Sequence, residues 1–75
     1  MKLDTCPQNQ NLKIISIDII DSKLKLRLYE IGIFPTANIK ILNKSFLKKT
    51  ILIQVLDSCF AIKSSIAKCV EVEYD

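Results

Sequence analysis

Short apolar stretches separated by polar residues make up most of the chain, and several of them alternate with the two-residue period of a strand. Alternation and a high content of β-branched residues predict strands over residues 12–18, 38–42, 50–56, 59–63 and 70–74. In the last of these stretches Val70, Val72 and Tyr74 share one face, which we expect to point inward. Asp57 and Ser58 predict a tight hairpin before the fourth strand, because Asp tolerates a positive φ better than most non-glycine residues.

Residues 20–32 carry two competing patterns. Leu24, Leu26 and Leu28 alternate as in a strand, whereas Leu24, Leu28 and Ile31 recur at the i, i+4 and i+7 spacing of a helix. Lys, Leu, Arg and Glu, which are common in this segment, are good helix formers. We therefore predict a helix, with Leu26 to one side of its apolar stripe.

Both ends of this helix carry capping signals. Asp21 or Ser22 can accept backbone N–H bonds at the N-terminus. Gly32 can take the left-handed conformation that ends a helix, and Pro35 prevents the helix from resuming. A second helical element, one turn long with a serine cap, is predicted over residues 64–68.

The order of these elements is strand, helix, three strands, short helical turn and strand. A curled sheet is the simplest way to bury so many apolar faces in 75 residues. We therefore predict a mainly β fold, a small SH3-like barrel of about five strands, with one α-helix after the first strand and a short helical turn before the last. The length allows a single domain over residues 1–75. Residues 1–11 show no periodicity, and we expect a lead-in segment outside the packed domain.

The composition indicates a folded protein. Hydrophobic residues make up 49 % of the chain, which has one Gly and two Pro. No apolar run approaches the ~18 to 20 residues that span a bilayer, and the first residues lack the apolar core of a secretory signal. We expect a cytoplasmic protein without direct membrane insertion.

The residue types argue against a metal centre and against catalysis. Cys6, Cys59 and Cys69 are an odd number at wide spacing, which predicts free thiols, while a weak thiolate site between Cys59 and Cys69 stays open. The chain has no His, the commonest transition-metal ligand, and a single Gly cannot form a phosphate-binding loop. We predict no enzyme activity, no metal site and no cofactor.

A loop between the second and third predicted strands contains the candidate binding residues. Phe46 and Leu47 are large apolar residues among polar neighbours, so they either fold back over the barrel mouth or form an exposed apolar anchor. Lys44, Lys48 and Lys49 form a small basic cluster in a chain of net charge +3. As an anchor with a basic rim, this loop would fit a protein with an acidic edge.

Several positions from residue 27 to residue 72 match one known sequence pattern, and the alignment needs no insertion or deletion. They are Arg27-Leu28, Ile31-Gly32, Pro35, Ala61-Ile62-Lys63 and Ala67-Lys68-Cys69-Val70-Glu71-Val72. The pattern resembles the FeoA family, the ferrous iron transport protein A family. Departures from it include Thr36 and Asp57, which stand where the family commonly has Gly, and the loop 45–50, which lacks the usual Pro and Gly.

The resemblance implies an accessory protein of ferrous iron uptake that acts by protein contact on the membrane transporter FeoB, which carries a cytosolic GTP-binding domain. The predicted partner-binding residues are Phe46, Leu47, Lys44, Lys48, Lys49 and Arg27. Arg27 occupies a family position on the predicted helix, where it can also pair with Glu30. The same fold occurs in iron-dependent repressors, but one helix leaves no room for a DNA-reading helix-turn-helix unit.

A second hypothesis keeps the barrel and makes it a small nucleic-acid-binding protein that uses Lys44, Lys48, Lys49 and Phe46. The other basic residues are dispersed and the chain has a single Arg, so we do not expect nucleic acid as the partner. Open strand edges would also allow a homo-oligomer.

Overall fold

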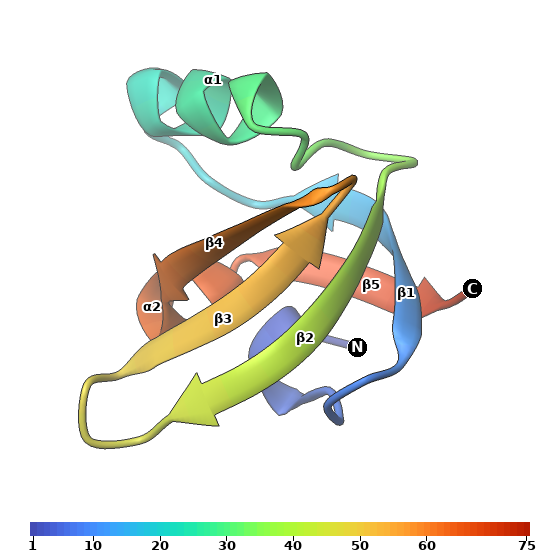
Figure 1. Ribbon diagram of the computed structural model, residues 1–75. Helices are drawn as coiled ribbons and strands as arrows, with labels where there is room; N and C mark the ends of the chain where they lie inside the picture. Colours follow the sequence, from blue (N-terminus) through green and yellow to red (C-terminus); the bar gives the residue numbers. More distant parts are fainter.

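The computed structural model describes all residues from 1 to 75 and contains five strands, two α-helices and one short 3-10 helix (Figure 1). In chain order the elements are η1 (Leu3–Thr5), β1 (Asn11–Ile17), α1 (Ser22–Glu30), β2 (Asn38–Ser45), β3 (Thr50–Val55), β4 (Ser58–Lys63), α2 (Ser64–Ala67) and β5 (Val70–Tyr74). The predicted mainly β architecture and its element order are confirmed.

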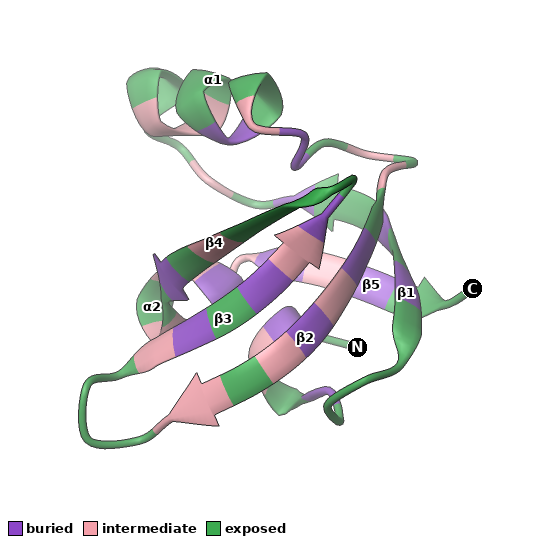
Figure 2. Cartoon of the chain, viewed as in Figure 1, coloured by how far each residue is buried: buried purple, intermediate pink, exposed green.

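The five strands form one antiparallel sheet in the order β4-β3-β2-β1-β5. The sheet curls on itself, so that β5 lies behind β2 and β3 in Figure 1, and α1 stands beyond the upper end of the barrel. The inward faces of the strands form one apolar core, which appears as alternating purple bands along β1, β2, β3 and β5 in Figure 2. Neither helix has the length and apolar character needed to cross a bilayer.

Two β-bulges interrupt the alternation and help the sheet to curl. The pairing register shifts between Ile14 and Ser16 in β1, and between Ile41 and Asn43 in β2. A bulge adds one residue to one strand, bends it and increases its twist. Strand β2 therefore continues to Ser45, beyond the predicted end at residue 42, because the alternation that predicted the strand stops at its bulge.

The last strand follows its prediction except at its end. Val70 and Val72 are fully buried, as predicted. Tyr74 is 57 % exposed, so its predicted inward position is wrong. It is the final residue of an edge strand, where no further element covers its ring.

The N-terminal segment belongs to the packed domain, and the expectation that it lies outside is wrong. Leu3 and Cys6 are fully buried, and η1 packs against α2 and β5. The backbone N–H of Val72 donates to the Met1 carbonyl oxygen at 2.7 Å, and Lys2 forms a β-bridge with Glu71. Leu3 and Cys6 therefore complete the core, although two apolar residues are too few to form a periodic pattern in the sequence.

The turn between β3 and β4 lies one residue earlier than predicted. Val55 pairs with Ser58, so Leu56 and Asp57 form the two-residue turn. Leu56 has the positive φ, +57°, that we had expected of Asp57. Two-residue hairpin turns favour positive φ at a central residue because that conformation matches the twist of the strands.

Helix α1 begins and ends at the predicted signals. The Asp21 carboxylate accepts hydrogen bonds from the backbone N–H groups of Lys23 and Leu24. At the other end Gly32 has a φ of +103°, and the N–H of Ile33 donates to the Leu28 carbonyl oxygen at 2.8 Å. A Cβ atom at Gly32 would also lie 2.8 Å from Val55 Cγ1, so both conformation and space require Gly here.

Candidate functional site

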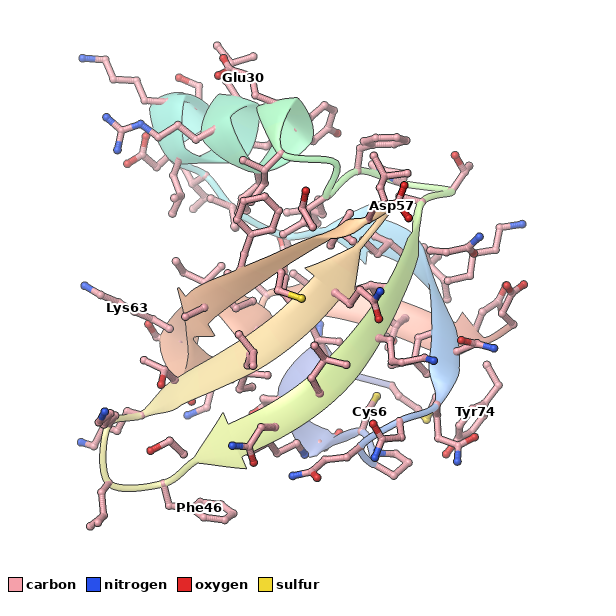
Figure 3. All side chains as sticks on the ribbon, viewed as in Figure 1. Cys6, Glu30, Phe46, Asp57, Lys63 and Tyr74 are labelled. Carbon is pink, nitrogen blue, oxygen red and sulfur yellow. The ribbon has the colours of Figure 1, made fainter.

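The loop between β2 and β3 is a free end of the sheet, and we call its residues 46–49 the hairpin tip (Figure 1). Phe46 is 88 % exposed and Leu47 is 99 % exposed. Figure 3 shows Phe46 pointing away from the barrel. Of the two alternatives for these side chains, folding back over the barrel mouth is wrong, and an exposed apolar pair is what the structure has.

Hydrogen bonds hold the base of the hairpin tip. The backbone N–H of Lys48 donates to Ser45 Oγ at 3.3 Å. Lys49 has a positive φ of +53°, and its carbonyl oxygen accepts a 2.9 Å hydrogen bond from the N–H of Ser64 at the start of α2. The tip is thus joined to a second element of the fold as well as to its two strands.

Two of the three predicted lysines flank the apolar pair. Lys48 and Lys49 are exposed within the hairpin tip. Lys44 is half-buried, and its Nζ donates to the Asp4 carbonyl oxygen at 3.0 Å, so this side chain ties the N-terminal segment to β2. Residues 31–56 contain four Lys and no Asp or Glu, so no acidic side chain of this stretch offsets the positive charge.

Arg27 does not belong to the same surface. It lies on α1, at the other end of the molecule from the hairpin tip (Figure 1). The ion pairs of the structure all involve Glu71, so the predicted pair between Arg27 and Glu30 does not form. This separation could not be predicted from the sequence, because only the fold determines how far α1 lies from the hairpin.

A second group of exposed apolar side chains, which we did not predict, lies at the α1 end. The most exposed are Ile20 and Leu56, followed by Leu26 on α1. The rings of Tyr29 and Phe34 lie close together, with centroids 6.3 Å apart and planes tilted by 53°. The position of Leu26 beside the helical stripe was the one sequence signal for this group.

A groove of about 480 Å³ opens next to this second group. Gly32 and Val55 line it together with Phe34 and Leu56, and Asn38 and Gln54 add polar groups. The groove carries no acidic side chain. Lys40 also lines the groove, and Lys25 lies beside Leu26 and Tyr29. Apolar side chains with lysines near them are therefore exposed at both ends of the barrel, and Phe46 and Leu47 at the hairpin tip are among the most exposed of them.

The three cysteines are free, and none belongs to a cluster of possible metal ligands. No group of three or more His, Cys, Asp or Glu side chains could hold a metal ion. Cys6 is buried, its Sγ donates to the Lys2 carbonyl oxygen, and burial raises the pKa of its thiol above the ordinary value. A thiol with a raised pKa stays protonated at neutral pH and is a poor nucleophile.

Comparison with protein families gives one match, to the FeoA domain, over residues 1–74. A search of curated protein sequences finds no match. Among solved structures, the iron(II) transport protein A of Clostridium thermocellum superposes with a TM-score of 0.89 at 22 % identity, over 99 % of this chain and 45 % of that one. This chain therefore spans less than half of that protein.

Two further structures have the same fold. FeoA of Stenotrophomonas maltophilia, solved with zinc and described as a prokaryotic SH3 domain protein, has a TM-score of 0.81 at 25 % identity, over 97 % of this chain and 89 % of that one. A manganese-dependent transcriptional repressor has a TM-score of 0.88 at 16 % identity, over 99 % of this chain and 36 % of that one. The predicted SH3-like barrel is confirmed.

Proposed function

The chain belongs to the FeoA family of ferrous iron transport, and from this membership we propose that it is a non-catalytic, cytoplasmic accessory protein of ferrous iron uptake. It acts by protein contact with the membrane transporter FeoB, on the cytosolic side. The hairpin tip makes the contact, with Phe46 and Leu47 as the apolar anchor and Lys48 and Lys49 beside them.

The exposure of Phe46 and Leu47 is the observation that supports this assignment. Neither side chain contributes to the core, so their apolar character brings no folding stability. Paired exposed apolar residues with polar neighbours are typical of binding surfaces. Burying both residues against a partner would remove them from water, and the central anchors of an interface usually supply most of its affinity.

Charge defines the partner surface. Lys48 and Lys49 are exposed and make no ion pair within the chain. Opposite charge on a partner raises the association rate and fixes the orientation of the complex. The partner patch is therefore an apolar pocket with an acidic edge, and binding weakens as salt screens the lysines.

A binding titration against the isolated GTP-binding domain of FeoB and against full-length FeoB in membranes tests the proposal. We expect saturable binding that Phe46→Ser or Leu47→Ser weakens about tenfold or more, each with an unchanged melting temperature. The matched control is Ile20→Ser, which removes a fully exposed apolar side chain from the α1 end and should bind like the unmodified protein.

The same assay tests the nucleic-acid hypothesis. Oligonucleotide binding that falls steeply with salt, together with no binding to either form of FeoB, would replace the transporter proposal. Phe46 is the one aromatic residue of the hairpin tip. Single-strand binders usually stack several bases on aromatic side chains, which favours a protein partner here.

A further inference from the structure

Strand β4 is an edge of the sheet, and half of its backbone groups point outward. Lys63 of β4 lies opposite Thr50 of β3. The N–H of the next residue, Ser64, donates to the carbonyl oxygen of Lys49, the residue before Thr50. Hydrogen-bonded and non-bonded residues alternate along an antiparallel pair. The N–H and C=O groups of Cys59, Ala61 and Lys63 therefore face away from β3, and none has another backbone hydrogen bond.

The two edges of the sheet differ in how they are covered. At β5 the N-terminal segment takes up the edge, since Val72 N–H donates to Met1 O at 2.7 Å and the Met1 ammonium donates to Val72 O at 3.0 Å. At β4 no segment does so. The strand pairs with β3 over its whole length without a bulge, and it contains no Pro. Natural edges usually carry such devices against pairing with another chain.

The side chains along this edge suit close approach. Cys59 and Ala61 are small and exposed, and they lie on the outer face of the sheet. The strand is bounded by opposite charges, with Asp57 before it and Lys63 at its end. Both are exposed, and neither makes an ion pair within the chain.

We propose that β4 pairs antiparallel with β4 of a second copy of this chain, about a twofold axis at Phe60. In this register Cys59 lies opposite the partner's Ala61, and Lys63 at the end of the strand lies beside the partner's turn residue Asp57. Cys59 and Ala61 both have outward-facing backbone groups, so those of one copy meet those of the other. The opposite charges at the two ends make the strand complementary to itself, which favours a second copy over an unrelated strand.

The dimer is a weak one, independent of the transporter contact. Pairing two short strands buries less area than a stable interface needs, so dimerisation belongs to the transient class. Sedimentation velocity over a range from about 10 µM to about 1 mM covers the affinities of that class. We expect the fraction of dimer to rise with concentration.

Charge reversal tests the register. Lys63→Glu and Asp57→Lys each place like charges opposite one another, and each should weaken the dimer about tenfold. The double variant Asp57→Lys with Lys63→Glu restores the opposite pairs and should recover the dimer. The matched control Lys68→Glu changes the net charge by the same amount as Lys63→Glu, away from the edge, and should leave the dimer intact.

A crosslink gives a second test. In the Ala61→Cys variant, oxidation should join two copies through Cys59 and the introduced thiol, because directly opposed strand positions lie within disulfide reach. Adding Cys59→Ser should abolish the crosslinked species. A protein that stays monomeric up to about 1 mM, or a double variant without recovery, would overturn the proposal; loss of FeoB binding alone would not.

Discussion

At the scale of single residues, Thr36 has a backbone conformation that β-branched residues rarely adopt. Its φ is +81°, in the left-handed region that favours Gly. The surrounding structure imposes this conformation, since the Thr36 N–H donates to Ile14 O at 2.8 Å between Pro35 and the start of β2. Thr36 also stands where the FeoA family commonly has Gly.

Thr36→Gly should therefore stabilise the protein. Relief of the left-handed strain is worth ~1–2 kcal/mol, and the added freedom of the unfolded chain offsets ~0.5–1 kcal/mol of it. We expect a net gain of about 1 kcal/mol, which raises the melting temperature of a domain of this size by roughly 4–8 °C in a circular dichroism melt. Thr50→Gly, in a strand, is the control and should lower it. An unchanged or lower value for Thr36→Gly would show that the position is unstrained.

Glu71 makes the stability depend on pH. Its Oε1 accepts a 3.2 Å hydrogen bond from the Met1 ammonium, and this contact, with Lys2 Nζ 3.5 Å from Oε2, lowers the pKa of the carboxyl below its ordinary value. A carboxyl whose pKa is lower in the folded state stabilises the fold above its ordinary pKa. That stabilisation is lost as the pH falls through the folded-state pKa.

Urea denaturation of Glu71→Gln at about pH 7, about pH 5 and about pH 3 measures this effect. The variant should be less stable than the unmodified protein at the highest pH, and the difference should shrink towards the lowest pH. Glu73→Gln, which changes an exposed carboxylate on the same strand without an ion pair, should show no such trend. A difference that stays constant with pH would mean that the carboxyl has its ordinary pKa.

At the scale of elements, the sequence predicts the five strands and α1 because each has its own local signal. Alternation marks the strands, and caps at Asp21 and Gly32 mark α1. The errors lie where the pairing between strands determines the end of a strand or the position of a turn. The bulge after Ile41 hides the end of β2, and the Val55–Ser58 pair moves the turn onto Leu56, whose side chain alone gives no turn signal.

The candidate site was predictable only in part, for a similar reason. The sequence identifies Phe46 and Leu47 as unusual in a loop. Whether two such side chains are buried or exposed depends on the course of the hairpin, which the sequence does not show. Lys44 is not part of the basic rim, because its Nζ donates a hydrogen bond to the carbonyl oxygen of Asp4, forty residues away. Arg27 is not part of the rim either, because α1 lies at the other end of the barrel from the hairpin tip.

At the scale of the whole molecule, the N-terminal segment completes the core. It covers the edge at β5 through Met1 and Lys2, and it places Leu3 in the interior. A domain of this size buries only about 60 % of the surface that its unfolded chain exposes, so each core side chain matters. A sequence pattern does not reveal this role, because one buried leucine in a short 3-10 helix has no period.

Leu3→Ala tests whether the segment supports the entire fold. Leu3 is 0 % exposed, and truncating a fully buried leucine costs ~2–5 kcal/mol. A domain of this length has a total stability of only ~4–11 kcal/mol. We therefore expect a fall in melting temperature of more than about 10 °C. Leu47→Ala, which removes the same atoms from the hairpin tip, should stay within about 0.5 kcal/mol of the unmodified protein. Equal melting temperatures for the two variants would show that the segment is an appendage, because a core residue and an exposed one would then contribute alike.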